Sequence, residues 1–413
     1  MKISVLGAGV VGLTTAWWLT EAGHEIVLID GAGRPAAGAS GANGAQLSYR
    51  YVAPMASPKM LRQLPGLLLP GEDAIKVSLD TELIGWGLRF LKACTGAEVA
   101  RTTAAQLALA ELSRAELERL LGKVPLDFGL RTAGKLVIFR KAADFVAATP
   151  DADDPAVALT PRQCLELEPN LALDVSEFAG GLYTSSEQVG DCGSFCEQLF
   201  AKLKESNRVD MRMDTAIGRP VVRNRRMTAI ETDRGVIEAD QFVLSLGSGA
   251  RAFAKSCGFN LPIYPVKGHS ITVPDEGKPP LTHSVTDYSR KIVYAPLPGA
   301  TRIAGFADFQ GYDTTPVPSR IAQLKAAAAD TFDIDTLGDV AASDVAPWAG
   351  LRPMTPDSRP VIGPSPLEGL FLNTGQGMLG WTLACGSARL TADLIDGKPP
   401  SCPVAPFDVA RFS

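Results

Sequence analysis

The sequence predicts an α/β protein with one discontinuous domain built on parallel strands and a second, β-rich antiparallel domain. Its opening reads as strand, helix, strand: residues 2–6 (KISVL) and 25–29 (EIVLI) are short apolar runs, and residues 10–22 between them are long enough for a helix. Buried strands of the same kind return at 239–249 and 370–373, each next to glycines. We therefore expect the first domain to be of the Rossmann type.

The second domain is predicted from residues 262–345, where short β-like runs alternate with Pro and Gly turns. This β-rich domain interrupts the segments that carry the parallel strands. We therefore expect the nucleotide-binding domain to comprise residues 1–123, 187–258 and 347–413, and the β-rich substrate domain to comprise residues 124–186 and 259–346.

Composition excludes several classes of function. The net charge of −5 gives no basic face for nucleic acid. The one basic cluster, Arg219, Arg223, Arg225 and Arg226, is expected to be a solvated hairpin tip. Seven scattered cysteines indicate buried thiols rather than a disulfide framework, and three histidines make a histidine-rich metal site improbable. We expect no metal.

The chain has no uncharged apolar stretch of 18 residues or more, so no membrane-spanning helix is expected. The N-terminal apolar run is broken by Gly7, Gly9 and Gly12, which argues against a signal peptide. A cytoplasmic location fits these features.

A dinucleotide fingerprint lies between the first strand and the first helix. Gly7 permits the tight turn, Gly9 lets the backbone approach a pyrophosphate, and Gly12 lets the helix pack on the sheet. Amides at the helix start then hold the phosphates. Asp30 ends the second strand, where its carboxylate can accept hydrogen bonds from a ribose 2′-hydroxyl. The motif suits FAD and NAD alike, although an acid at position 30 argues against a 2′-phosphate.

Longer stretches resemble a known family. The matching segments are MKISVLGAGVVGLTTAWWLTEAGHEIVLID, SGANGAQLS, GDCGSFCEQL, YPVKGHS, GLRPMTPDSRPVIG and LFLNTGQGMLGWTLACGS. They resemble the D-amino acid oxidase-like flavoprotein superfamily and, within it, the small subunits of bacterial D-amino acid dehydrogenases. The resemblance covers nearly the whole chain, and its last two segments are the most specific.

The resemblance implies FAD as the cofactor and gives a set of binding residues. The fingerprint binds the ADP half, the small residues after position 39 lie against the pyrophosphate and flavin, and one backbone position contacts adenine. The last glycine loop opens a helix whose N-terminus faces the flavin N1–C2=O edge, where its dipole stabilises negative charge. The implied residues are Gly7, Gly9, Val10, Val11, Gly12, Asp30, Ser40, Gly41, Ala42, Asn43, Gly44, Ile217, Gly247, Gly375, Gly377, Met378, Leu379, Gly380, Trp381 and Thr382.

The resemblance also implies an amino acid as the substrate. Arg352, in GLRP, matches the family arginine that binds the substrate carboxylate, and a planar guanidinium suits two carboxylate oxygens. Tyr51, Tyr264 and Tyr288 are candidates for pocket walls or a second carboxylate contact. Hydride transfer from the α-carbon to flavin N5 gives an imino acid, which hydrolyses to a 2-oxo acid and ammonia. We assign no catalytic acid or base.

Two departures from the family pattern concern the acceptor and the flavin. Gln376 stands where related dehydrogenases commonly have His, which removes a titratable group. Oxygen-using sarcosine-type relatives carry a lysine in a strand resembling 301–306, and this stretch (TRIAGF) has none. A quinone or another redox carrier is therefore the expected acceptor. Peripheral contact with the cytoplasmic face of the inner membrane would follow, with PGLLLP (65–70) as a candidate segment.

Three alternatives remain open from the sequence. A cyclic or N-substituted amino acid, such as D-proline or a hydroxyproline, could be the substrate. An NAD-dependent dehydrogenase would need only the first strand–helix–strand unit and leaves GQGMLGWT unexplained. A non-catalytic FAD-binding subunit of a larger complex would give Arg352 no task.

Overall fold

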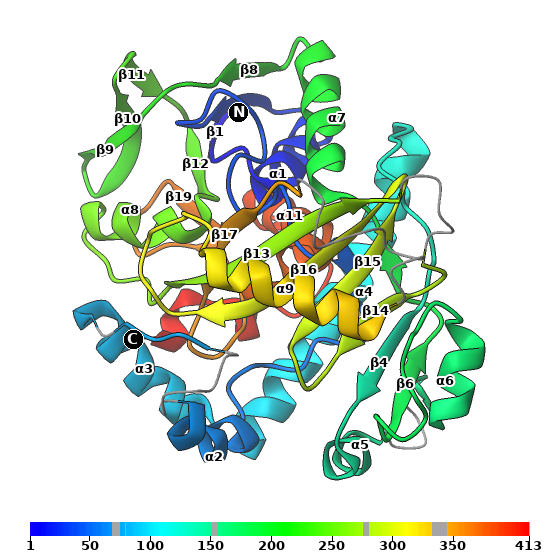
Figure 1. Ribbon diagram of the computed structural model, residues 1–413. Helices are drawn as coiled ribbons and strands as arrows, with labels where there is room; N and C mark the ends of the chain where they lie inside the picture. The colour runs from blue at the N-terminus through cyan, green and yellow to red at the C-terminus, as the bar shows by residue number, and fades with distance from the viewer. Residues whose placement is uncertain (68–74, 79, 150–154, 276–280, 333–344, 413) are drawn as a thin grey trace.

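The computed structural model describes residues 1–67, 75–78, 80–149, 155–275, 281–332 and 345–412. Two sheets dominate the molecule, and helices pack around both of them (Figure 1). The predicted combination of a parallel-strand domain and a β-rich antiparallel domain is confirmed.

The first sheet has six strands, of which all but β18 run parallel. In order across the sheet they are β18 (Val361–Pro364), β19 (Leu370–Thr374), β12 (Gln241–Leu244), β1 (Lys2–Leu6), β2 (Glu25–Ile29) and β8 (Val209–Arg212). The central strands β1, β2 and β12 are buried along most of their length, as expected for strands covered on both faces.

Helices cover one face of this sheet in a shared apolar core. They are α1 (Val10–Glu21), α4 (Gly96–Lys123), α7 (Cys192–Glu205) and α11 (Gly380–Ile395). Helix α1 is apolar nearly all round because it packs between the sheet, α7 and α11. Over the other face lie α8 (Ala250–Ser256) and a three-stranded sheet of β9 (Ile217–Arg223), β10 (Arg226–Thr232) and β11 (Gly235–Glu238).

The second sheet has eight strands, which are antiparallel except for the pair β14–β4. In order they are β17 (Trp348–Met354), β13 (Tyr264–Pro274), β16 (Ala300–Asp308), β15 (Ile292–Leu297), β14 (Ser284–Asp287), β4 (Lys135–Phe139), β6 (Gly180–Thr184) and β5 (Val157–Leu159). A separate two-stranded ribbon joins β3 (Gln46–Leu47) to β7 (Gln188–Val189).

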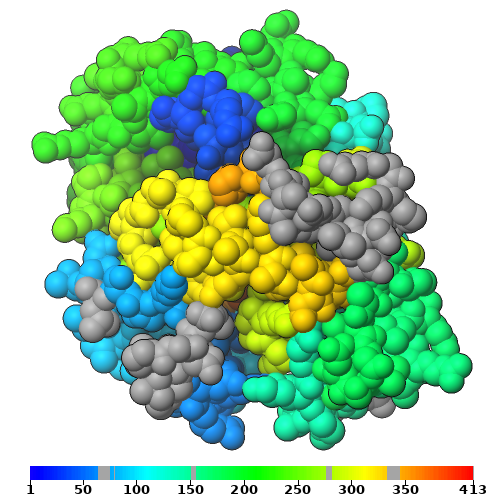
Figure 2. All heavy atoms as spheres, in the orientation of Figure 1, coloured from blue at the N-terminus to red at the C-terminus, as the bar shows by residue number. Residues whose placement is uncertain are grey.

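The two faces of the eight-stranded sheet differ. Helices α9 (Pro318–Thr331) and α6 (Pro161–Leu167) contribute to an apolar core on one face, and α9 occupies the centre of the molecular surface there (Figure 2). The opposite face meets residues 42–48 of the first domain, as the contacts below show. The remaining elements are α2 (Pro58–Leu67), α3 (Thr81–Ala93), α5 (Ala142–Ala148), and the 3₁₀ turns η1 (Gly247–Gly249), η2 (Gly377–Leu379), η3 (Ala405–Phe407) and η4 (Val409–Phe412).

The structure adds detail to two of the sequence predictions and to the start of one helix. The segment from residue 347 was assigned to the nucleotide-binding domain, yet β17 pairs along its length with β13 in the eight-stranded sheet. Helix α4 begins at Gly96, where the Thr95 side chain accepts the Glu98 amide and caps the helix. Of the arginine cluster, Arg223, Arg225 and Arg226 lie at a hairpin tip, where Asn224 and Arg225 both have positive φ, whereas Arg219 lies near the start of β9.

The seven cysteines are free, and five of them are buried. Within the described ranges, no helix is both long and apolar enough to cross a bilayer. Of the predicted membrane-contact segment, residues 68–70 lie outside the described residues.

Candidate active site

The predicted cofactor residues gather at one edge of the six-stranded sheet. Gly7, Asp30, Gly247 and Gly375 follow the carboxyl ends of β1, β2, β12 and β19. Those four strands are parallel neighbours, so the loops after them lie side by side. Ligands of open α/β sheets bind outside this edge.

The fingerprint turn is crowded in a way that only glycine permits. Gly7 has a φ of +109°, and a Cβ atom on Gly12 would lie 1.8 Å from the Gly7 carbonyl oxygen. Gly9 is the N-cap residue of α1 and has no capping side chain. The amides of the first turn, including that of Val11, therefore receive no capping side chain from position 9. The Val10 amide donates to Ser40 Oγ at 3.0 Å.

Asp30 closes the same turn from the end of β2. Its Oδ2 accepts the Ala8 amide at 2.7 Å, and its Oδ1 accepts the Ala32 amide at 2.8 Å. A carboxylate oxygen has more than one acceptor direction, so both oxygens can still receive a hydroxyl. The acid thus has two tasks, to hold the turn and to present acceptors beside it.

The loop after β2 is fixed by side chains from the eight-stranded sheet. Arg302 donates through Nη1 to the Asn43 carbonyl oxygen at 3.0 Å and through Nη2 to Asp191 Oδ2 at 3.0 Å. Ser270 Oγ donates to the Ala42 carbonyl oxygen at 2.7 Å. A Cβ on Gly44 would lie 3.0 Å from Val293 Cγ2, and Gly41 is packed against the Ala36 carbonyl. Small residues therefore allow the loop to lie flat on the sheet.

The last glycine loop links the two domains at the start of α11. Gln376 pairs through its backbone with Met354 at the end of β17, and its side chain donates to Asn373 Oδ1 at 2.8 Å. On the other side, the Ser48 amide donates to Thr382 Oγ1 at 3.1 Å. The N-terminus of α11 thus lies between the strand that carries Arg352 and the loop that ends at Ser48.

Other predicted cofactor residues are placed as follows. Gly375 and Gly377 have positive φ. Trp381 is buried against Phe128 and Phe195 and donates to the Gly190 carbonyl oxygen, so its ring packs in the core. Met378 is 52% exposed, Leu379 and Gly380 complete the turn before α11, and Ile217 opens β9 over the far face of the sheet.

Arg352 lies on β17 with its guanidinium over Gly268. A Cβ on Gly268 would come within 2.5 Å of Arg352 Nη2, so a side chain there would displace the guanidinium from this position. Nη1 donates to the Phe306 carbonyl oxygen at 2.6 Å. Phe306 has a φ of +67°, which is unusual for a bulky residue, and it lies within the bulge of β16 opposite Lys267–His269 of β13. Burial lowers the pKa of Arg352 to about 10, so the side chain stays cationic at neutral pH.

Among the residues that the structure describes, Arg352 Nε and Nη2 donate no further hydrogen bond. The Nε and Nη2 side of the guanidinium is therefore available to donate two parallel hydrogen bonds to the two oxygens of a carboxylate. Arg302, by contrast, uses Nε, Nη1 and Nη2 on Thr272, Asn43 and Asp191.

The three predicted tyrosines do not lie together. Tyr264 is fully buried against Trp86 and Phe309, and its hydroxyl donates to Asp80 Oδ2 at 2.6 Å. Tyr264 is thus part of the packing between α3 and β13. Tyr51 and Tyr288 lie at the other end of the sheet. The Tyr51 ring is stacked 4.0 Å from Lys135 Nζ, and the Tyr288 hydroxyl accepts from Lys59 Nζ at 2.8 Å.

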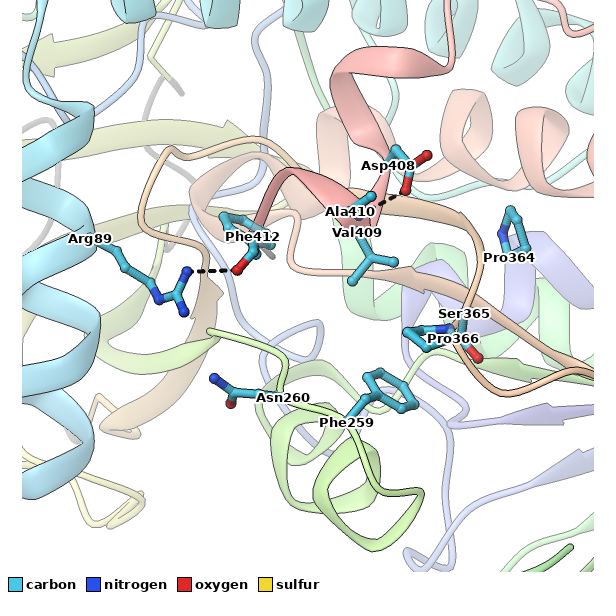
Figure 3. Close-up of a pocket in the computed structure, with 10 residues that line it drawn as sticks. All are labelled: Arg89, Phe259, Asn260, Pro364, Ser365, Pro366, Asp408, Val409, Ala410 and Phe412. Atoms are coloured by element: carbon cyan, nitrogen blue, oxygen red, sulfur yellow. Dashed lines mark hydrogen bonds between the residues drawn. The ribbon is translucent and has the colours of Figure 1, made fainter. Parts of the chain in front are cut away.

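A cavity of about 410 Å³ lies away from these residues (Figure 3). Its lining includes Arg89, Asn260, Pro364 and Asp408, and Arg89 donates to the Phe412 carbonyl oxygen. Pro364 pairs near the beginning of β19, at the opposite edge of the sheet from the fingerprint. We therefore do not assign this cavity to the chemistry.

Comparison with known proteins adds to this geometry. Residues 2–394 match the family described as FAD dependent oxidoreductase. The chain belongs to this family. It is 39% identical to D-amino acid dehydrogenase 2 of Ralstonia nicotianae over 100% of both chains, and 40% identical to D-amino acid dehydrogenase 2 of Pseudomonas aeruginosa over 97% of this chain and 96% of that protein.

Solved structures share the fold at lower identity. Glycine oxidase from Geobacillus kaustophilus superposes with a TM-score of 0.74 at 21% identity, covering 99% of this chain and 98% of that one. L-proline dehydrogenase from P. horikoshii superposes with a TM-score of 0.71 at 18% identity, covering 100% and 97%. The expected family and fold class are confirmed.

The protein is an FAD-dependent oxidoreductase, and its residues fit the cofactor. The Gly7–Gly12 crowding leaves a turn without side chains where a pyrophosphate lies, and Asp30 presents carboxylate oxygens at its side. The glycines of the segment ending at Gly44 would let its backbone approach a flat ring closely. The roles of individual residues remain predictions.

Three residues at the junction between the loop and the eight-stranded sheet were not singled out from the sequence. They are Lys135, whose Nζ donates to Ser48 Oγ, and Ser48 and Gln46, of which Gln46 Nε2 donates to Ser284 Oγ. A signal for one of them was available, since Lys135 is a cation directly before the apolar run LVIF. The strand could have been recognised as buried and the lysine as exceptional.

We expect Gly12→Ala to abolish or sharply reduce FAD retention. The added methyl would overlap the Gly7 carbonyl, and overpacking of this kind costs about 1–3 kcal/mol or more. The readout is flavin absorbance per mole of purified protein. Gly31→Ala is the matched control, because a Cβ there meets nothing within 4 Å. Equal flavin content in Gly12→Ala and the control would contradict the assigned phosphate turn.

Proposed function

We propose that this protein is a D-amino acid dehydrogenase, which oxidises the α-carbon–amine bond of a D-amino acid. The observation that carries the proposal is the free side of the Arg352 guanidinium, next to the glycine loop that opens α11. Curated relatives of full length bear the name D-amino acid dehydrogenase. A non-catalytic subunit would have no use for this arginine.

Arg352 binds and orients the substrate carboxylate. Gly268 leaves room for its guanidinium, and the Phe306 carbonyl oxygen holds Nη1, so Nη2 and Nε form the fork for two oxygens. Met354 on β17 pairs with Gln376 in the loop before α11, so this loop lies beside the strand that carries Arg352. With its carboxylate fixed on β17, the substrate would extend its α-carbon toward that loop. Orientation of this kind supplies much of the rate of such reactions.

FAD, when bound, supplies the hydride acceptor. Arg352 and the loop residues hold the substrate so that the α-hydrogen faces this acceptor. The substrate amine must lose a proton, and we assign no protein base to that step. The imino acid formed by loss of the hydride is hydrolysed by water to a 2-oxo acid and ammonia.

The residues that we propose to hold FAD are those of the fingerprint turn, Asp30, the loop 40–44 and the α11 loop. Backbone amides contribute most of this set, because side chains are small or absent at these positions. We propose that residues 1–123, 187–258 and 347–413 belong to the FAD-binding domain, except that β17 within the last segment is part of the substrate-binding sheet.

We expect Arg352→Ala to lose roughly 30- to several-thousand-fold in catalytic efficiency, because breaking a partly buried charge-assisted pair costs about 2–5 kcal/mol. The variant should retain FAD, since the guanidinium contacts the sheet of the substrate domain. Arg352→Lys should recover only part of the loss, because an ammonium does not fork onto both oxygens. Steady-state kinetics of the wild type, Arg352→Ala and Arg352→Lys with a D-amino acid measures both losses in catalytic efficiency, and flavin absorbance measures FAD retention.

Amino-acid amides serve as the control for Arg352. They present no carboxylate, so the wild type should use them poorly and Arg352→Ala should lose little further. Near wild-type turnover of amino acids by Arg352→Ala would show that the carboxylate binds elsewhere.

We propose a quinone or another redox carrier as the electron acceptor, because the stretch 301–306 lacks a lysine. Peripheral contact with the cytoplasmic face of the inner membrane accompanies quinone use. Oxygen should then be a poor acceptor, measured as slow hydrogen peroxide release beside fast reduction of a soluble quinone. Rapid, stoichiometric peroxide formation in air would identify an oxidase instead.

A further inference from the structure

The Arg352 guanidinium reaches across a neighbouring strand. Arg352 lies on β17, and β13 separates this strand from β16. The guanidinium passes over Gly268 of β13, where a Cβ atom would lie 2.5 Å from Nη2, and Nη1 donates to the Phe306 carbonyl oxygen of β16 at 2.6 Å. The direction of Nε and Nη2 therefore depends on where this carbonyl lies.

The direction of the Phe306 carbonyl is set by a bulge in β16. The register between β13 and β16 shifts here, so Phe306 and Ala307 of β16 both lie opposite Gly268. Phe306 has a φ of +67°, which a bulky residue rarely adopts. Such a conformation persists only where surrounding contacts hold it. The contacts of the Phe306 side chain therefore help to determine where its carbonyl points.

The Phe306 ring lies on the face of the sheet that α9 covers. The residue is 7% exposed and belongs to the apolar core between α9 and the sheet. The guanidinium carbon of Arg320 lies 4.4 Å from the centre of the ring, within the range of a cation–π contact. The His269 ring lies edge-on to it, with the ring centres 6.3 Å apart. A buried cation thus contacts the residue whose carbonyl binds Arg352.

Arg320 is itself fixed by a forked ion pair. Its Nε donates to Asp308 Oδ2 at 3.0 Å and its Nη2 to Asp308 Oδ1 at 2.5 Å, and both side chains are fully buried. Its Nη1 donates to Gln323 Oε1 at 3.0 Å. Because the guanidinium is planar, these three hydrogen bonds fix its orientation over the Phe306 ring.

A role in stability alone explains this ion pair poorly. Arg320 lies in the first turn of α9, where the helix dipole opposes a cation. Removal of both charges from water also offsets much of their attraction, so apolar residues of similar size often stabilise a fold at least as well. An apolar pair would not supply a rigid cation over the ring of a residue with positive φ.

The same carboxylate acts on Arg352. Burial lowers the pKa of Arg352 to about 10, and the attraction of Asp308 opposes part of that effect. His269 adds no charge at neutral pH, because burial lowers its pKa to about 4 and its Nε2 accepts the Val317 amide at 3.2 Å. The buried charge of Asp308 thus lies near the arginines on both faces of the sheet.

We propose that Arg320 and Phe306 are positioning residues for the carboxylate anchor. Arg320, fixed on Asp308, holds the Phe306 ring from the α9 side of the sheet. The Phe306 carbonyl oxygen then holds Arg352 so that Nε and Nη2 point toward the substrate carboxylate. Neither positioning residue touches the substrate. This inference rests on the proposed function, in which Arg352 binds the α-carboxylate of a D-amino acid.

A double-mutant cycle with Arg352→Ala tests this coupling. Arg320→Lys keeps a charge beside Asp308 but loses the planar fork, and Phe306→Leu keeps an apolar side chain but loses the ring face. With a D-amino acid, each single variant should lower kcat/KM by roughly 10- to 100-fold, the effect of a displacement of about 1 Å in a bound substrate. In the Arg352→Ala background, the same substitutions should change kcat/KM by no more than about twofold, because the anchor that they position is gone.

Amino-acid amides separate positioning from general damage to the protein. An amide presents no carboxylate to Arg352, so Arg320→Lys and Phe306→Leu should use it about as well as the wild type does. The flavin content of both variants should equal that of the wild type. A loss of folded structure would instead lower the turnover of acid and amide by the same factor.

Arg140→Lys is the matched control. Arg140 Nε donates to the fully buried Asp287 carboxylate at 2.8 Å, and Asp287 lies on β14, four strands across from β17. This variant weakens a buried arginine–aspartate pair in the same sheet, away from the anchor. It should lower the melting temperature as Arg320→Lys does, yet keep the wild-type kcat/KM with both D-amino acids and amides.

The outcomes distinguish this inference from the function on which it rests. If no D-amino acid reduces the flavin of the wild type, the proposed function itself fails. If Arg352→Ala is impaired but Arg320→Lys and Phe306→Leu stay within about twofold of the wild type, the positioning role is wrong. Losses of the same factor in both backgrounds, or for acid and amide alike, would also contradict it and assign the two residues to the stability of the fold.

Discussion

The guanidinium of Arg302 joins the two domains at the point where the active site forms. It projects from β16 of the eight-stranded sheet and binds the Asn43 carbonyl oxygen, Asp191 at the start of α7, and Thr272. Arg302 is 6% exposed, so water has little access to its N–H donors, and these three acceptors satisfy them instead. Leaving one such donor unpaired costs about 1–3 kcal/mol or more.

This junction explains why the candidate site contains residues from both sheets. Because the loop after β2 is held flat on the open face, its small residues lie between the fingerprint turn and strands β13 to β16. The same face carries Arg352 at one end and Lys135 at the other. The strained backbone of Phe306 directs a carbonyl toward Arg352, so the rigidity of the sheet fixes the anchor before a substrate arrives.

The cofactor end could be predicted from the sequence because its constraints are local. Gly7, Gly12 and Asp30 lie within one strand–helix–strand unit, and the Gly12–Gly7 contact is a short-range steric requirement. The start of α11 was likewise marked by its own glycines. For these residues the expected backbone geometry is present in the structure.

The substrate end depends on pairings between distant segments, which local patterns do not encode. Tyr264 was a candidate wall residue by type, but the register of β13 turns it toward α3 and Asp80. The sequence placed residues 347–413 in the nucleotide-binding domain, and the pairing of β17 with β13 in the eight-stranded sheet depends on a contact between distant segments. Lys135 and Ser48 are 87 positions apart, and their contact arises only when β4 joins the sheet beside β14.

The proposed function is tested most directly by anaerobic mixing of the FAD-loaded protein with the two enantiomers of one amino acid while flavin absorbance is followed. The D enantiomer should bleach the flavin, and deuterium at its α-carbon should slow the bleaching, because the α-carbon–hydrogen bond breaks in that step. Bleaching by the L enantiomer at a comparable rate, or by neither enantiomer of any amino acid, would contradict the assignment.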